Sequence, residues 1–226
     1  MVRYHPNSSQ ATAERTATVA DRRLNSVRCE FEHGRTIVVF VRPFAASRSS
    51  VWQLLTSPNE LVKWSPHTAD RDLSEMGKAT FTWLGTEQDV DAVIPGSESA
   101  GVVLVADPPR LLEHSWATDV LAWQLSDAGD GSGRSHASDT SSASSASDAS
   151  GASEASTVLT LRHTLADERM ASAVAAGWHL CFEVADSVLA GHPIPPMRGP
   201  SAMQHGWADL NRRYAKALGV PPTKIG

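Results

Sequence analysis

Cysteines and runs of basic residues are scarce in this 226-residue chain, and each scarcity narrows its chemistry. The two cysteines, Cys29 and Cys181, follow no metal-ligand spacing. Cys181 also falls on an apolar helix face, so we expect it to be a small buried hydrophobic residue. The 20 Lys and Arg residues form no continuous basic run. They are outnumbered by 25 Asp and Glu residues, and the net charge is −5. This balance gives no general attraction to nucleic acid, and we expect no nucleic-acid partner.

Long apolar runs are absent as well. No stretch approaches the roughly 18 consecutive apolar residues that a membrane span requires. The first 16 residues, MVRYHPNSSQATAERT, lack the apolar centre of a secretory signal. We therefore expect no membrane association and a cytoplasmic location.

Motifs for cofactors and activated nucleophiles are not found. The chain has no Gly-rich phosphate loop, no G-x-S-x-G motif and no Cys-based triad. His67, Asp70 and Asp72 are close in sequence but follow no recognised ligand spacing. We expect neither a bound metal nor a cofactor.

The most informative segment that is present covers residues 157–191, where a strand leads directly into a long helix. Leu159, Leu161 and His163 alternate with polar residues, which predicts a half-buried strand with His163 on its inner face. Asp167 follows and can accept hydrogen bonds from the free amides of a helix start.

The helix in this segment is strongly amphipathic. One continuous apolar stripe at helical spacing contains Trp178, Cys181, Phe182, Ala185, Val188 and Leu189. His179, Glu183 and Asp186 lie beside the stripe, and Gly191 with Pro193 predicts the helix end. Gly177 inside the helix is interpreted as room for the close approach of a neighbouring backbone or bulky side chain. A strand feeding such a helix predicts a sheet with the helix lying across it.

The domain limits follow from composition. Residues 1–34 are predicted to be a polar, loose tail, residues 35–220 a single domain, and residues 221–226 a second tail. Within the domain, residues 127–156 contain eleven Ser and seven Ala and no larger apolar side chain, which predicts a disordered insertion. Strand-like runs flank the insertion closely, so we interpret it as an overgrown hairpin loop, with a phosphorylated Ser tract as the alternative.

The remaining pattern predicts a strand, two short helices, further strands and a last helix. The first strand covers 35–41, Ser47 caps the first helix, and Pro58 opens a second helix that ends near Trp64. Further strands are expected at 70–73, 79–84, 89–94, 101–106, 111–118 and 120–125. The last helix is expected at 201–218. This order is typical of an α+β fold, an antiparallel sheet with helices on one face.

These residues resemble a known family. The stretch ASRSSVWQLLTSPNELVKW at 46–64 resembles the first helical element of the SRPBCC (START-like, helix-grip) superfamily. LTLRH at 159–163 with GWH at 177–179 resembles the branch named after the activator of heat-shock protein 90 ATPase. The resemblance spans about 35–218 without the insertion. It implies a curved antiparallel sheet of about six to seven strands around a long C-terminal helix, with two short helices after the first strand and an apolar cavity in between.

The aromatic residues agree with such a cavity. Seven Trp stand against two Tyr and five Phe, and they are spread over nearly every predicted element. They can simply fill the core, or they can line a preformed site for an apolar or aromatic molecule. The predicted ligand-binding residues are Trp52, Trp64, Trp83, His114, Trp116, His163, Trp178 and Phe182.

Three residues are candidates for catalysis. His163 faces the long helix from the strand, and His179 can reach Glu183 one helical turn later. An imidazole held by a carboxylate can act as a general base or orient a bound polar group. The simpler interpretation, which we prefer, is a structural hydrogen bond that ties helix to strand.

Three functions remain open on this basis. The first is non-catalytic binding of a hydrophobic or aromatic small molecule in the cavity. The second is a cyclase- or lyase-like enzyme that uses His163, His179 and Glu183 as acid–base groups. The third, implied by the family name, is a co-chaperone-like module with a protein partner. A homodimer is compatible with all three.

Overall fold

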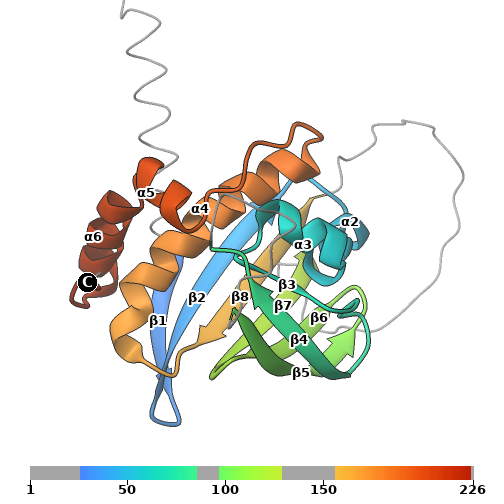
Figure 1. The fold of residues 1–226 in the computed structure, drawn as a ribbon, viewed down its shortest axis with the longest axis horizontal. Helices are drawn as coiled ribbons and strands as arrows, with labels where there is room; N and C mark the ends of the chain where they lie inside the picture. Colours follow the sequence, from blue (N-terminus) through green and yellow to red (C-terminus); the bar gives the residue numbers. More distant parts are fainter. Residues whose placement is uncertain (1–25, 86–96, 129–155, 225–226) are drawn as a thin grey trace, which may run out of the picture.

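Eight strands form one antiparallel sheet in the computed structural model, which describes residues 26–85, 97–128 and 156–224 (Figure 1). Their order across the sheet is β1-β2-β8-β7-β6-β5-β4-β3. The strands are β1 (Val27–Glu32), β2 (Arg35–Phe44), β3 (His67–Ala69), β4 (Gly77–Trp83), β5 (Glu98–Asp107), β6 (Leu111–Trp116), β7 (Asp119–Asp127) and β8 (Thr157–Thr164).

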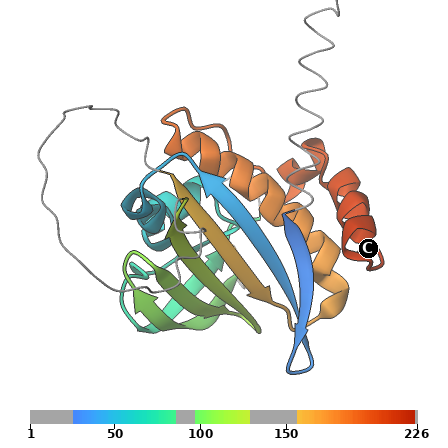
Figure 2. The same ribbon diagram turned by 180° about the vertical axis from the view of Figure 1, so that it is seen from behind.

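The long helix lies across the concave face of this sheet. The helices are α2 (Arg48–Thr56), α3 (Pro58–Trp64), the 3-10 turn η1 (Glu168–Met170), α4 (Ala171–Leu189), α5 (Pro200–Gln204) and α6 (Trp207–Leu218). Seen from behind, β1, β2, β8 and β7 face the viewer and α4 passes behind them (Figure 2). The predicted α+β helix-grip fold is confirmed, with eight strands in the described residues where about six to seven were expected.

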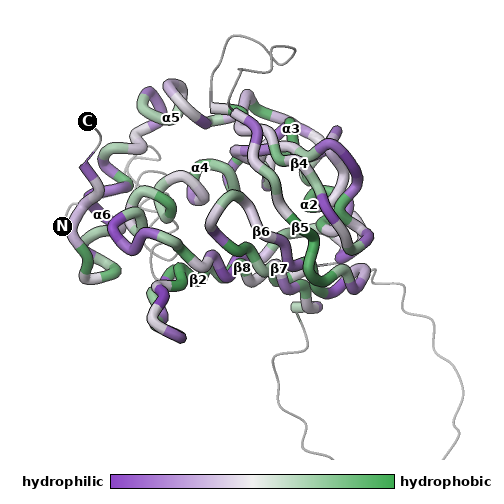
Figure 3. The backbone as a smooth tube through the Cα atoms, turned by 60° about the horizontal axis from the view of Figure 1, so that its bottom comes forward, coloured by the Kyte–Doolittle hydropathy of each residue, from purple (hydrophilic) through white to green (hydrophobic). Residues whose placement is uncertain are grey.

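The strand β8 follows its predicted alternation. Thr157, Leu159, Leu161 and His163 are buried, and the residues between them are partly exposed. β8 sits in the middle of the sheet, so His163 has neighbours on both sides: it pairs with Val38 of β2 and with Leu121 of β7. Hydrophobic residues are frequent along α4 and along the central strands of the sheet (Figure 3). This register presents His163 to the underside of α4.

The two short helices begin where the sequence predicts. The Ser47 side chain accepts a hydrogen bond from the Ser50 amide and caps α2. Pro58 occupies the first turn of α3, where its missing N–H removes no helical hydrogen bond. Both helices bury one face, and Trp64 at the end of α3 is almost fully buried.

Three predicted elements differ from the structure. Residues 27–32, assigned to a loose tail, form edge strand β1, whose residue Phe31 is 71% exposed and therefore gave little core signal. The strand expected at 70–73 lies earlier in the chain, at β3. The side chains of Asp70 and Asp72 accept hydrogen bonds from main-chain amides, and the chain turns at these residues. The expected last helix is two helices, since Gly206 adopts a left-handed φ of 80° between α5 and α6.

The strand expected at 89–94, the tail residues 1–25 and the centre of the Ser-rich insertion, 129–155, lie outside the described residues. The two ends of the insertion are described. Asp127 pairs with Thr157, and the Ala128 amide donates to the Ser156 carbonyl at 3.1 Å. The insertion therefore connects two neighbouring antiparallel strands.

The α2 cap gives a direct test of these local contacts. Ser47→Ala should lower the free energy of unfolding by about 1 kcal/mol, because the Ser50 amide loses its acceptor. Urea unfolding followed by circular dichroism measures the change. Ser49→Ala, on the exposed part of the same helix turn, is the matched control and should be neutral; an equal loss in both variants would show that the cap does not stabilise the helix.

Candidate functional site

A chain of hydrogen bonds joins α4 to the sheet through His163. Trp178 on α4 donates from Nε1 to Nδ1 of His163 at 3.0 Å. Because Nδ1 accepts, the ring proton lies on Nε2, which donates to Oδ2 of Asp119 at 2.9 Å. The second oxygen of Asp119 accepts from the Ala166 amide at 2.7 Å. Both nitrogens of His163 are thus engaged, and its ring is fixed in one tautomer and orientation.

Asp119 remains ionised in this arrangement. Partial burial by itself would raise the pKa of its carboxyl group, but the hydrogen bonds from His163 and from the Ala166 amide outweigh burial and lower the pKa. A carboxylate that accepts from an imidazole N–H holds that imidazole in place. Sequence reasoning missed Asp119, which lies 44 residues from His163 at the start of the neighbouring strand.

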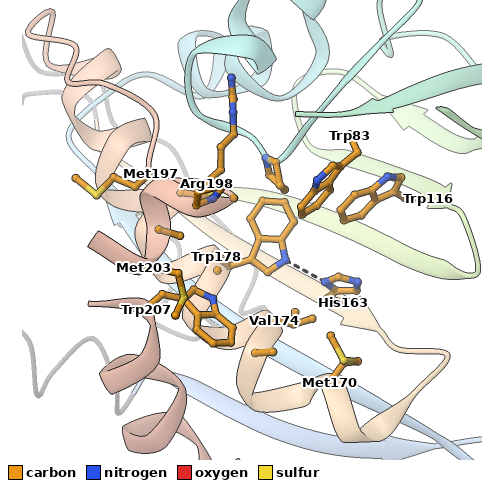
Figure 4. Close-up of a pocket in the computed structure, with 17 residues that line it drawn as sticks. Trp83, Trp116, His163, Met170, Val174, Trp178, Met197, Arg198, Met203 and Trp207 are labelled. Carbon is orange, nitrogen blue, oxygen red and sulfur yellow. Dashed lines mark hydrogen bonds between the residues drawn. The ribbon is translucent and has the colours of Figure 1, made fainter. Parts of the chain in front are cut away.

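A cavity of about 500 Å³ lies beside this chain of hydrogen bonds, bounded by α4, by the segment that forms α5 and the start of α6, and by the ends of strands β4, β6 and β8 (Figure 4). Its volume is in the range of small-molecule sites. The wall consists of Pro66, Trp83, Trp116, His163, Met170, Ala173, Val174, Gly177, Trp178, Cys181, Met197, Arg198, Gly199, Pro200, Ala202, Met203 and Trp207. Nearly all of these side chains are apolar.

The rim of the cavity exposes large apolar side chains. Trp83 is 43% exposed and stacks on Trp116, with ring centroids 5.6 Å apart and an interplanar angle of 14°. Met170 and Met203 are exposed to a similar degree. Indole faces and flexible thioethers together form an adaptable apolar entrance.

Arg198 is the charged residue of the wall, and its guanidinium group is already hydrogen-bonded to backbone carbonyls. Its Nη1 donates to the carbonyls of Val62 at 2.9 Å and Ser65 at 2.7 Å, at the C-terminal end of α3. A cation is stabilised there by the helix dipole, while burial lowers the pKa of the guanidinium. The head group points away from the cavity, and the stem contributes to the wall (Figure 4).

Four of the eight predicted ligand-binding residues line the cavity: Trp83, Trp116, His163 and Trp178. The other four, Trp52, Trp64, His114 and Phe182, lie in the core behind it. Trp64 stacks on Phe182 with ring centroids 6.1 Å apart, and Trp178 packs edge-on against Trp123 at 5.2 Å. Trp178 therefore separates a tightly packed aromatic core from the open cavity.

Two further buried histidines support this core. His114 accepts from Trp123 Nε1 at 3.2 Å, and burial lowers the His114 pKa to about 4. Burial also lowers the pKa of His67 well below its ordinary value, and its Nδ1 has no partner within the described ranges. Both rings are neutral at neutral pH, and neither lines the cavity.

The structure does not bring His179 and Glu183 into the cavity. His179 faces α6, where Nδ1 lies 2.8 Å from the Tyr214 hydroxyl, and its Nε2 lies 3.3 Å from the Glu183 carboxylate. The contact with Tyr214 ties α4 to α6, so the hydrogen bond between helix and strand that the sequence suggested is made by His163 and not by His179. The catalytic set proposed from the sequence is therefore divided between the two sides of α4.

Gly177 does not have the neighbour that the sequence interpretation required. A Cβ added there would meet no heavy atom within 4 Å, apart from the backbone of its own helix and its chain neighbours. Its φ is not positive either. Glycine inside a helix costs about 1 kcal/mol relative to alanine, and the packing of the described residues does not explain that cost.

Seven of the 17 wall residues come from residues 197–207, and none of these seven was predicted as a site residue from the sequence. Met203 and Trp207 lie within the single last helix expected at 201–218, four residues apart, and this helical spacing was the available signal. The break at Gly206 turns the two residues into walls of the cavity.

The described residues contain neither a membrane-spanning helix nor a metal-ligand cluster. No helix among them is long and apolar enough to cross a membrane. Within the same ranges, no three His, Cys, Asp or Glu residues are placed to hold a metal ion.

The sheet curved around a long helix, with a cavity between that helix and the following segment, defines a helix-grip α+β protein. Residues 45–190 match the family described as "Activator of Hsp90 ATPase homolog 1-like protein". The chain belongs to this family, which lies in the SRPBCC superfamily. No curated protein matches the chain significantly.

Solved structures with the same fold are distant in sequence. CalU16 from Micromonospora echinospora is 16% identical, with a TM-score of 0.53, and the match covers 85% of this chain and 96% of that protein. A conserved protein of unknown function from Enterococcus faecalis is 13% identical, with a TM-score of 0.57, and the match covers 88% of this chain and 94% of that protein. Similarity at this level supports the fold alone.

A double-mutant cycle tests the bond between Trp178 and His163. Each single change to Phe should lower the free energy of unfolding by about 2 kcal/mol, because each leaves a buried partner unsatisfied. The double variant should lose about 1 kcal/mol less than the sum of the two. Urea unfolding measures all four proteins, with the exposed-site change His192→Phe as control. Additive losses would show that the bond contributes nothing.

The buried histidines predict loss of stability in mild acid. The pKa of His114 is about 4 in the fold and near 6.5 when unfolded, so the unfolded chain takes up a proton first. The contribution of neutral His114 to the free energy of unfolding is therefore fully present above pH 6.5. The free energy of unfolding should fall by up to about 3 kcal/mol as the pH approaches 4. His67 acts in the same direction, and Asp119 adds a loss only at lower pH.

Urea unfolding at a series of pH values checks this dependence. The variant His114→Gln keeps an acceptor for Trp123 and does not titrate, so its stability should fall less steeply in this range. A variant curve as steep as that of the wild type would assign the acid sensitivity to other groups.

Proposed function

We propose that the protein binds a neutral apolar or aromatic small molecule in the cavity beside Trp178 and does not transform it chemically. The observation that carries this proposal is the cavity itself, about 500 Å³ with an almost wholly apolar wall. A preformed apolar cavity with few polar groups is the general form of a small-molecule site. The exposed rim of Trp83, Met170 and Met203 gives the ligand an apolar way in.

The charges of the wall favour a neutral ligand. Arg198 is held at the end of α3 by two carbonyls, and both nitrogens of His163 are hydrogen-bonded. A charged ligand would lose its hydration without gaining a counter-charge, which costs several kcal/mol. Uncharged ring systems avoid this cost.

The same contacts favour binding without catalysis. A general base needs a free lone pair within reach of its substrate, and the lone pair of His163 Nδ1 accepts from Trp178. His179 and Glu183, the partners that the enzyme alternative required, do not line the cavity: His179 contacts Tyr214 of α6, and Glu183 pairs with His179. Burial raises the pKa of Cys181, also in the wall, to about 12, so its thiol is not an activated nucleophile.

A matched pair of fluorescent probes tests the proposal. Phenylnaphthylamine is neutral, and anilinonaphthalene sulfonate is the same ring system with one anionic group. The neutral probe should bind with a blue-shifted emission and quench the tryptophans, and the sulfonate should bind at least about tenfold more weakly, because its charge has no partner in the wall. Titration by fluorescence measures both affinities.

The site is located with a variant. Val174→Trp places a large ring in the cavity wall and should reduce binding of the neutral probe, while Ala217→Trp on the exposed face of α6 should not. If the neutral probe does not bind the wild-type protein, or binds the Val174→Trp variant equally well, the cavity is not a ligand site.

A further inference from the structure

The middle of α4 contains a glycine that no contact among the described residues explains. Helix-interior glycines are usually retained where another group approaches the backbone or where φ is positive. Gly177 has neither in the part of the chain that the structure describes: beyond its own helix backbone and chain neighbours a Cβ would meet no heavy atom within 4 Å, and its φ is not positive. By contrast, Cβ atoms at Gly101 and Gly199 would lie within 3 Å of neighbouring atoms, so the fold itself requires those two glycines.

The open space next to Gly177 is the cavity. Gly177 lines it together with Ala173, one helical turn earlier, and Cys181, one turn later. Trp178, the next residue, lies between Met203 and Trp207 on one side and Trp83 and Trp116 on the other (Figure 4). A side chain at 177 would therefore enter the cavity between aromatic walls and remove part of its volume.

We propose that Gly177 determines which ligands the cavity accepts, because a flat part of the ligand lies against the backbone of α4 at this position. The proposal rests on the proposed function and goes one step further, from the class of ligand to the residue that sets its size. Glycine exposes the peptide plane to a ring face, and any larger side chain would occupy the space of that ring. The lower helix propensity of glycine is tolerated at this position because the space beside it accommodates the ligand.

The test combines stability without ligand and affinity for phenylnaphthylamine. Gly177→Ala adds one methyl group and a better helix former, so its thermal midpoint should stay the same or rise by about 2 to 4 °C. Its affinity for the probe should fall several-fold. Gly177→Leu should lower the affinity about tenfold or more, since one or two methylene groups in an apolar site have effects of this size, while the midpoint is maintained.

Ala217→Leu adds comparable bulk on the exposed face of α6 and is the matched control, with affinity expected to be unchanged. A second ligand sharpens the result: naphthalene, which lacks the phenyl ring, should lose less affinity than phenylnaphthylamine on Gly177→Ala. Equal losses for the two ligands would overturn the role of Gly177 in setting ligand size.

The two proposals fail in different ways. If the wild-type protein does not bind the neutral probe, the proposed function is wrong, and the role of Gly177 falls with it. If the wild type binds and Gly177→Leu binds equally well, the cavity is a ligand site but Gly177 does not select the ligand. If Gly177→Ala lowers the thermal midpoint, the glycine serves the fold, and the inference is overturned even if affinity falls.

Discussion

The hydrogen bond from Trp178 to His163 is the contact on which the arrangement of helix, sheet and cavity depends. It joins the middle of α4 to the central strand β8, and Asp119 on β7 holds the accepting ring from its other side. The same carboxylate accepts the Ala166 amide in the connection from β8 to α4. The Asp119 carboxylate thus fixes the His163 ring and the start of the connection from β8 to α4. Through His163 it also fixes the indole of Trp178, which separates the core from the cavity.

The two sides of that indole differ in their packing. Behind it, the rings of Trp64, Trp123 and Phe182 are in mutual contact, and the N–H groups of both tryptophans have acceptors, Leu54 O and His114 Nε2. In front of it, three methionines of the wall surround open space. Rigid rings with satisfied polar groups specify one arrangement, whereas thioether chains can adjust to different shapes. The protein therefore combines a fixed support with an adaptable surface.

Local patterns in the sequence predicted most of the fold. The alternation in β8, the stripe of α4, the Ser47 cap and Pro58 are each set by neighbouring residues. Edge strand β1 was missed because an edge residue such as Phe31 faces solvent and mimics a tail. Half of the predicted ligand-binding residues line the cavity; Trp64 and Phe182 instead pack on each other, and sequence spacing cannot distinguish a ring in the core from a ring in a wall. Asp119 and Met203 reach the site only through long-range packing.

The protonation state of Cys181 affects the kind of ligand that the proposed site could bind without reacting with it. Its sulfur belongs to the wall, and burial raises its pKa to about 12, so at neutral pH the thiol is protonated almost all the time. Thiolates, not thiols, attack electrophilic carbon. An electrophilic compound bound at the proposed site would therefore face a protonated thiol and not a thiolate.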